Sequence, residues 1–208
     1  MARLISGLDV ARVRENAARI REEIGDAQLL AAVKYVPLEE LGVLAEAGLT
    51  LLGENRAQDL EAKATAHPGF RWHFIGQLQS RKVKDILPHA ELIHSVASDS
   101  ALRQLERHGT PETEILVEVN VAGEEAKAGV APEALGDFIA RSPVRVTGLM
   151  TMPPFAAEPE ASRPYFARLR ELAAEHGLHH LSMGTSQDFA VAVEAGSTIV
   201  RVGTILYR

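Results

Sequence analysis

The sequence predicts an α/β fold of the (β/α)₈ TIM barrel type, in which eight parallel strands close into a ring inside a layer of helices. Three observations predict it. Short apolar runs alternate with helical segments along all 208 residues, and strict alternation implies parallel strands with right-handed crossovers. There are about eight such runs, the number that closes a barrel. No G-x-G-x-x-G motif follows the first run, which disfavours the main alternative, an open doubly wound sheet.

An extra helix precedes the first strand. Val13, Ala17, Ile20 and Ile24 recur at helical spacing, and Gly25 ends the segment. Strands are expected at 29–37, 51–55, 70–76, 91–96, 114–121, 144–152, 179–184 and 197–206, and the intervening helices at 38–48, 56–66, 80–87, 99–108, 132–141, 159–176 and 187–195. The last strand nearly reaches the end of the chain, so we expect the final barrel helix to be missing or replaced by the leading one.

Composition narrows the class of protein. The chain is 46% hydrophobic and 24% charged, as in ordinary globular proteins, and its length suits a single domain over residues 1–208. A net charge of −6 argues against nonspecific binding to nucleic acid or anionic membranes. The absence of cysteine excludes disulfides and thiolate metal sites. No signal peptide or membrane span is expected, so we predict a cytoplasmic protein.

Lys34 is the first unusual residue. It lies in the apolar run LLAAVKYVP at 29–37, where an unpaired ammonium would be costly to bury. One interpretation is that Lys34 lies just past the buried segment and reaches water on its flexible stem. The other is an amine held at the mouth of a site, where it can form a Schiff base.

The last two strands indicate a phosphate site. Ser186 follows the turn after the seventh strand, where its hydroxyl can cap the next helix or bond an anion. Gly203 and Thr204 end the eighth strand, where a ligand can approach the backbone. Barrel phosphate sites are often built from these two loops. The alternative for each motif is an ordinary cap or a glycine turn.

Arg201 is a second unusual charge, inside the apolar stretch TIVRVGTIL. A guanidinium keeps its proton, so a buried one needs acceptors. It could form a structural ion pair, or it could donate to a ligand inside the barrel. A lysine, an arginine and a phosphate cradle together fit pyridoxal 5′-phosphate (PLP), whose aldehyde needs an amine and whose ring nitrogen needs a partner.

The histidines carry no assignment. None stands in a metal-ligating pattern, so no metal site is predicted. His73 and His94 could line the pocket, although strand histidines bonded to backbone acceptors are commoner. We assign no catalytic residue.

Several stretches in order resemble the pyridoxal-phosphate homeostasis protein family, single-domain relatives of the alanine racemase N-terminal barrel. They are AAVKYVP, LLGENRAQD, WHFIGQLQSRK, IHSV, VNVAGEEAKAG, GLMTMPPF, LSMGTSQD and GSTIVRVGTILY. The resemblance implies a PLP aldimine on Lys34, Asn55 near the ring hydroxyl and Arg201 toward the ring nitrogen. It also implies phosphate contacts from Ser186, Gly203 and Thr204.

Family members are thought to buffer or deliver PLP without established turnover. The resemblance therefore implies a non-enzymatic carrier. We expect a monomer that makes transient contact with PLP-dependent apo-enzymes. One alternative is a PLP-dependent amino-acid racemase. That reaction needs a second acid or base, and Tyr35 is expected to alternate away from Lys34, while Tyr165 lies in a helix and Tyr207 at the terminus. A Schiff-base aldolase acting on a phosphosugar is the other alternative, and it leaves Arg201 unexplained.

Overall fold

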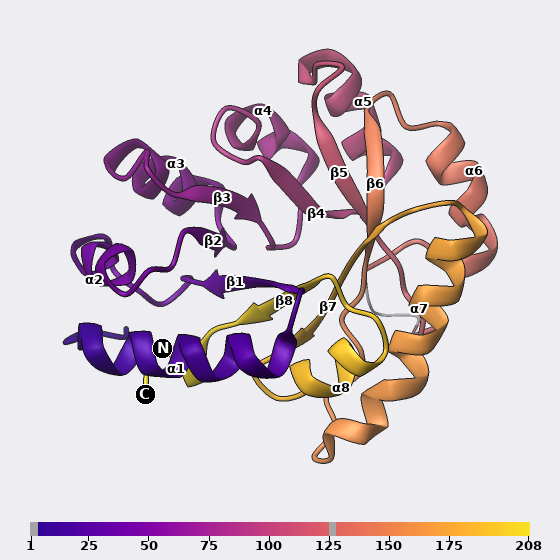
Figure 1. Cartoon of the computed structure of the whole chain (residues 1–208). Helices are drawn as coiled ribbons and strands as arrows, with labels where there is room; N and C mark the ends of the chain where they lie inside the picture. Colours follow the sequence, from indigo (N-terminus) through magenta and orange to yellow (C-terminus); the bar gives the residue numbers. More distant parts are fainter. Residues whose placement is uncertain (1–3, 125–127) are drawn as a thin grey trace.

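Eight parallel strands form a closed barrel in which neighbours in the sequence are neighbours in the ring (Figure 1). The computed structural model describes residues 4–124 and 128–208, so part of the motif at 119–129 lies outside the described residues. The barrel closes where β1 pairs in parallel with β8, with Leu30 opposite Arg201. The predicted fold class is confirmed. Within the described ranges, no helix has the length and apolar character needed to cross a bilayer.

The elements alternate as predicted. The strands are β1 Gln28–Ala32, β2 Leu51–Glu54, β3 Arg71–Phe74, β4 Leu92–Val96, β5 Glu114–Glu118, β6 Arg145–Met150, β7 His180–Thr185 and β8 Ile199–Val202. The helices are α1 Val10–Ile24, α2 Leu41–Glu46, α3 Ala57–Ala66, α4 Val83–Ile86, α5 Asp99–His108, α6 Leu135–Ala140, α7 Arg163–Glu175 and α8 Phe189–Glu194. Short 3₁₀ segments lie at Leu38–Glu40, Ser80–Lys82, Pro132–Ala134, Pro159–Ser162 and Thr204–Leu206.

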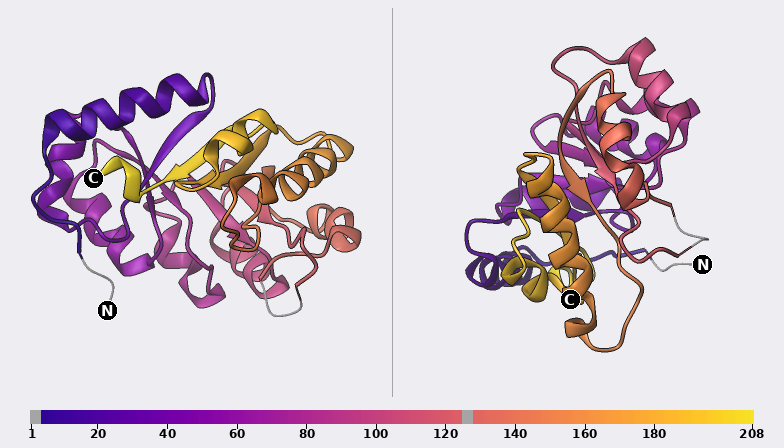
Figure 2. Two further views of the ribbon diagram at one scale, coloured as in Figure 1. Left: turned by 90° about the horizontal axis from the view of Figure 1, so that it is seen from below. Right: turned by 90° about the vertical axis from the view of Figure 1, so that its right-hand side faces the viewer.

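The leading helix α1 lies where a helix after β8 would complete the outer layer of the barrel. It packs against β1, α2 and α8 on the outside of the ring (Figures 1 and 2). Its N-cap is Asp9, whose carboxylate accepts a hydrogen bond from the Arg12 backbone N–H at 2.8 Å. The Asn16 side chain donates to the carbonyls of Leu206 and Arg208. The helix therefore closes the layer and also holds the end of the chain.

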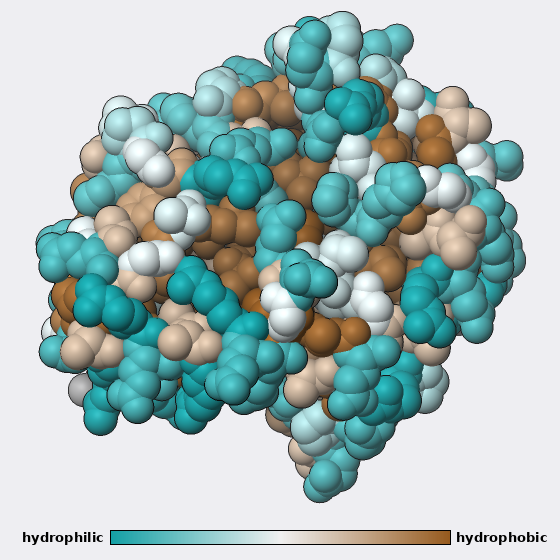
Figure 3. Space-filling view, viewed as in Figure 1, coloured by the Kyte–Doolittle hydropathy of each residue, from teal (hydrophilic) through white to brown (hydrophobic). Residues whose placement is uncertain are grey.

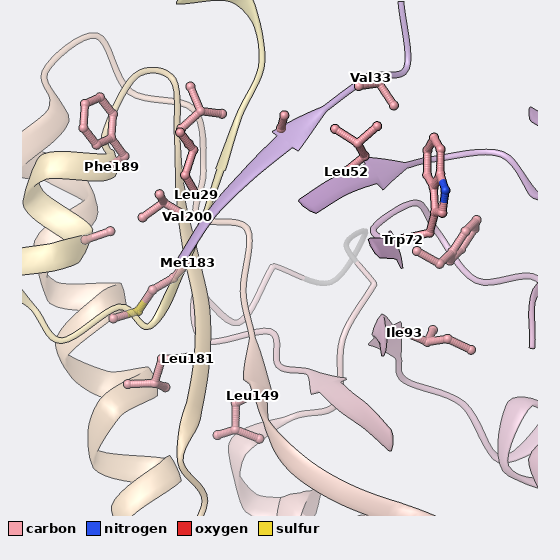
Figure 4. Packing of buried hydrophobic residues seen from close by; sticks show 14 of the residues in the cluster. Leu29, Val33, Leu52, Trp72, Ile93, Leu149, Leu181, Met183, Phe189 and Val200 are labelled. Carbon is pink, nitrogen blue, oxygen red and sulfur yellow. The ribbon is translucent and has the colours of Figure 1, made fainter. Parts of the chain in front are cut away.

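The larger hydrophobic core lies between the barrel wall and the helices. Outward-facing strand residues such as Leu181, Met183 and Trp72 pack there with the apolar faces of the helices (Figure 4). Hydrophilic residues surround apolar ones on the face shown in Figure 3. Since side chains alternate along a strand, the residues between these outward-facing ones point into the barrel.

The barrel interior combines apolar and polar side chains. Leu30, Leu51, Leu92, Leu116, Met150 and Ile199 form an apolar cluster separate from the larger core. His73, His94, Ser182 and Arg201 are buried polar residues on β3, β4, β7 and β8. The strand registers place the two sets beside each other, with Leu30 opposite Arg201 and Met150 opposite Ser182.

Six strands end earlier than predicted, and the ends of β1 and β8 matter most for the site. β1 stops at Ala32, and a turn carries Lys34. β8 stops at Val202, because Gly203 adopts φ −123° and ψ −90° and a 3₁₀ turn follows. The apolar residues after these points continue into turns that pack on the core, so hydrophobicity alone overestimated the strand lengths.

Candidate functional site

All six residues predicted to contact the cofactor line one cavity of about 400 Å³. The cavity opens at the carboxyl ends of the strands. Lys34, Asn55, Ser186, Arg201, Gly203 and Thr204 reach it from β1, β2, β7 and β8 or the loops that follow them. Ile75 and Met152 supply apolar surface on the other sides. The barrel thus brings together six residues that are spread over most of the chain.

Lys34 is exposed in the turn after β1. It is not buried within the strand, and it is one of the residues that line the cavity. The expectation that Tyr35 points away from Lys34 is wrong, because the Lys34 Nζ lies 4.7 Å from the centre of the Tyr35 ring. The alternation argument fails here because these residues belong to a turn. Tyr35 nevertheless lines a neighbouring hollow with Tyr207, outside the cavity of Lys34.

A buried ion pair braces the strand ends that carry Lys34 and Asn55. The Lys63 Nζ on α3 lies 2.7 Å from the Glu54 carboxylate and donates to the Val33 carbonyl at 2.8 Å. The other carboxylate oxygen of Glu54 accepts from the Asn55 backbone N–H at 2.8 Å. Both side chains are largely shielded from water, with exposures of 9% and 0%. One ion pair therefore fixes the residue before Lys34 and the backbone of Asn55.

Tyr207 adds a second brace beneath the same strand end. Its buried hydroxyl donates to the Ala32 carbonyl at 3.2 Å. Burial raises the pKa of the Tyr207 phenol, and the Glu54 carboxylate acts in the same direction. The phenol therefore stays protonated and remains a hydrogen-bond donor.

Asn55 presents an unsatisfied acceptor to the site. Its side-chain Oδ1 is buried and has no hydrogen-bond partner among the described residues. Gly76, two residues after β3, allows this arrangement, because a Cβ there would come within 2.0 Å of the Asn55 carbonyl oxygen. Buried polar atoms are nearly always paired in folded proteins. The unpaired oxygen is therefore an indication of a ligand with a donor group.

Ser186 and Gly203 meet across the loops after β7 and β8. The Gly203 N–H donates to the Ser186 hydroxyl oxygen at 3.1 Å, and Thr204 begins the following 3₁₀ turn. One interpretation of the sequence was that Ser186 caps the next helix, and this is wrong. That helix begins three residues later and has Asp188 at its N-cap position. The Asp188 carboxylate instead accepts hydrogen bonds from the backbone N–H and hydroxyl of Thr185.

Arg201 is 6% exposed and is held entirely by neutral acceptors. Its two terminal nitrogens donate to the Ser182 carbonyl and hydroxyl, to the Thr151 carbonyl and to the Met152 sulfur. A structural ion pair, the alternative interpretation, is not found among the described residues. Burial lowers the pKa of Arg201 to about 10, with Glu118 and Asp188 acting in the opposite direction. The guanidinium therefore remains charged at neutral pH.

Four of the five guanidinium N–H groups take part in these bonds. The fifth, Nε–H, has no partner within the described part of the chain, and Arg201 lines the cavity. The cavity therefore contains an unpaired buried acceptor on Asn55 and an uncommitted donor on Arg201.

His73 and His94 differ from their predicted surroundings. Neither histidine is among the residues that line the cavity, and neither bonds a backbone acceptor among the described residues. They bond each other and Ser182, which is in turn bonded by Arg201. The sequence does place His73, His94 and Ser182 within predicted strands. It could not show that their side chains meet, because the strand pattern does not tell which residues face each other across the barrel.

The comparisons with known proteins agree with the fold. The model of the alanine racemase N-terminal domain family matches residues 8–208. The pyridoxal phosphate homeostasis protein of Aquifex aeolicus is 41% identical, with 95% of both chains covered, and that of Pseudomonas aeruginosa is 38% identical, with 95% of this chain and 90% of the relative covered. This chain belongs to the pyridoxal phosphate homeostasis protein family.

Solved structures extend the comparison within and beyond this family. PipY of Synechococcus elongatus, solved with PLP bound, is 31% identical, covers 94% of this chain and 100% of its own, and superposes with a TM-score of 0.83. Alanine racemase of Corynebacterium glutamicum is 19% identical, covers 100% of this chain and 63% of its own, and has a TM-score of 0.74. The second likeness shows the barrel fold alone. The resemblance drawn from the sequence motifs is confirmed.

Proposed function

We propose that this chain binds PLP in the cavity at the barrel mouth, with Lys34 as the covalent attachment, and serves intracellular PLP homeostasis by holding and releasing the cofactor. The observation that carries the proposal is the single cavity lined by all six predicted residues, with an unpaired acceptor and an uncommitted donor inside it. A homeostasis relative that covers 95% of this chain and the PLP-bound PipY structure support the choice of ligand.

Each residue has a role that follows from its chemistry. PLP supplies an aldehyde that condenses with an amine with loss of water, together with a ring hydroxyl, a ring nitrogen and a phosphate. Lys34 supplies the amine, and Asn55 supplies an acceptor for the ring hydroxyl. Ser186, Gly203 and Thr204 offer hydroxyl and N–H donors for the phosphate, the first two of which bond each other in this structure.

Arg201 limits the chemistry that the site can support. A guanidinium is a donor only, so a ring nitrogen in front of it accepts a hydrogen bond and carries no proton. An unprotonated ring withdraws electrons less strongly than a ring partnered by a carboxylic acid. The arginine therefore favours holding the cofactor over reactions that pass through a carbanion.

The side chains around the cavity favour a carrier over a racemase. Among the described residues, the titratable side chains that line the cavity are Lys34 and Arg201. None of the three tyrosines lines it. Racemisation requires a second proton donor on the opposite face of the substrate. We propose that the domain over residues 1–208 acts without turnover, as a cytoplasmic monomer that passes PLP to apo-enzymes through transient contacts.

The test is reductive trapping. Purified protein mixed with PLP and reduced with borohydride should carry the phosphopyridoxyl mass on the peptide containing Lys34, with a visible absorbance before reduction. Lys34→Arg should lose both signals. Lys84→Arg, which changes an exposed lysine on α4, is the matched control and should keep both.

Two outcomes would contradict the proposal. If the wild-type protein showed no adduct on Lys34, PLP binding at this site would be excluded and a cofactor-free aldolase would gain support. If the loaded protein interconverted L-alanine and D-alanine at enzyme-like rates, the carrier role would be wrong. Incubation with an apo-enzyme should transfer PLP and restore that enzyme's activity.

A further inference from the structure

A chain of hydrogen-bonded side chains crosses the inside of the barrel from Arg201 to His73. The Arg201 Nη1 lies 2.5 Å from the Ser182 Oγ, which lies 2.8 Å from the His94 Nδ1. The His94 Nε2 lies 2.9 Å from the His73 Nδ1. The four residues come from β8, β7, β4 and β3, and all are at most 6% exposed. None of them is an acid.

The direction of each proton follows from the donors available. A guanidinium only donates, so the Ser182 oxygen accepts from Arg201. The Ser182 hydroxyl proton is then satisfied by donation to the His94 Nδ1, which leaves the His94 proton on Nε2. That N–H donates to the His73 Nδ1, so His73 also carries its proton on Nε2. The reverse tautomers would also pair every contact, with the His94 Nδ1–H donating to Ser182, but they would leave the buried Ser182 hydroxyl proton without an acceptor among the described residues.

Both histidines are neutral in this arrangement. Burial lowers the pKa of His73 to about 3, with Arg71 and His180 acting in the same direction. Burial also lowers the pKa of His94, aided by His73, Arg201 and His180. Protonating either ring would add a second buried charge near the Arg201 guanidinium. It would also place two donors against each other along the chain.

The arrangement turns lone pairs toward the cation. Successive dipoles have their negative ends directed at Arg201, which compensates part of the charge in the absence of a bonded carboxylate. The Ser182 and Thr151 carbonyls bind the same terminal nitrogens. The plane of the guanidinium is therefore fixed, and Nε–H is left as the donor available to a ligand.

We propose that Ser182, His94 and His73 are positioning residues that fix the orientation of Arg201 toward the ring nitrogen of bound PLP. The proposal rests on the PLP-binding function proposed above. It assigns a role to two buried histidines that no cofactor contact requires. The chain holds a full positive charge in front of the ring nitrogen without supplying a proton that the nitrogen could accept.

The first test needs no cofactor. In the wild-type protein labelled with ¹⁵N-histidine, NMR correlation spectra distinguish protonated from unprotonated ring nitrogens. Both His73 and His94 should be neutral with the proton on Nε2 at pH 7. A proton on the Nδ1 of His94, or a charged ring, would overturn the proposed chain.

The second test uses a matched pair at His94 together with Ser182→Ala. His94→Asn places an amide oxygen where Nδ1 stood and can still accept from the Ser182 hydroxyl. His94→Gln places its amide near the former Nε2 and leaves the Ser182 hydroxyl without that acceptor. Losing one such bond is worth about 1 kcal/mol, or roughly a fivefold faster loss of PLP.

Comparing these three variants distinguishes a role in positioning Arg201 from a role in packing the barrel interior. Ser182→Ala and His94→Gln should show a shifted visible absorbance maximum and roughly fivefold faster PLP loss. His94→Asn should retain the wild-type absorbance. Equal effects of Asn and Gln, or a wild-type spectrum in Ser182→Ala, would overturn the proposal. Absence of any PLP adduct in the wild type would instead defeat the binding function, while the histidine tautomers would still test the chain.

Discussion

Two buried cations stand near the barrel mouth, and they are satisfied in different ways. Lys63 lies outside the barrel wall and is neutralised by the Glu54 carboxylate at 2.7 Å. Arg201 lies inside the barrel and is bonded by carbonyls, a hydroxyl and a sulfur. The paired charge holds two backbones in place, and its field is largely cancelled. The unpaired charge keeps its field and one free donor for a ligand.

The difference explains why both burials are tolerated. A buried ion needs either an opposite charge or several oriented acceptors. Lys63 has the first and Arg201 has the second. The two solutions have different consequences when a partner is removed, and these consequences can be measured.

Lys63→Met is expected to have the largest effect. It leaves the fully buried Glu54 carboxylate without its counterion, which should lower the free energy of unfolding by about 3–5 kcal/mol. Urea unfolding followed by circular dichroism measures the loss. The double variant Lys63→Met/Glu54→Gln should recover much of it because no buried charge remains. Arg201→Met should cost less than Lys63→Met, and equal costs would break the comparison.

The second-largest expected effect is that acid lowers the free energy of unfolding. The folded-state pKa of His73 is about 3, below its ordinary value of 6.5, so below pH 6.5 the unfolded chain binds a proton that the folded chain does not. The free energy of unfolding should fall by about 2 kcal/mol between pH 7 and pH 5 from His73 alone. His94 acts in the same direction.

Unfolding measured between pH 7 and pH 5 tests this slope, because ordinary carboxyl groups stay charged over that range. His73→Gln should make the slope shallower. His108→Gln removes an exposed histidine from α5 and should keep the wild-type slope. An unchanged slope in His73→Gln would show that His73 is not held neutral inside the barrel.

Tyr207→Phe should have a smaller effect. It removes one hydrogen bond, the one to the Ala32 carbonyl, which is worth about 1 kcal/mol of stability. Tyr165→Phe on α7 is the matched control, with an expected change within about 0.5 kcal/mol. Thermal or urea unfolding measures both. If Tyr207→Phe matched its control, Tyr207 would not brace the strand end beside Lys34.

Asn55→Ala should have the smallest effect on stability and a distinct effect on binding. The Asn55 Oδ1 is buried without a partner, so its removal should leave the PLP-free protein as stable as before or up to about 1 kcal/mol more stable. PLP should dissociate faster from the same variant. A clear loss of stability without PLP would mean that Asn55 serves the fold and not a ligand.

The alternation of apolar runs and helical periods determined the barrel class, the eight strands and the leading helix. The local pattern suffices because strict alternation permits few topologies. The motif residues then identified Lys34, Asn55, Arg201 and the loop residues of one cavity. Their convergence could be predicted because the carboxyl ends of all barrel strands meet at one face.

Only the tertiary structure decided how the two buried cations are satisfied. The acceptors of Arg201 lie on β7 and just after β6, and the hydrogen-bonded chain continues from Ser182 to β4 and β3 across the interior. Lys63 meets Glu54 and the Val33 carbonyl because α3 packs back on the strand that precedes it. Such contacts depend on strand stagger and side-chain direction, which the order of residues along the chain does not encode locally.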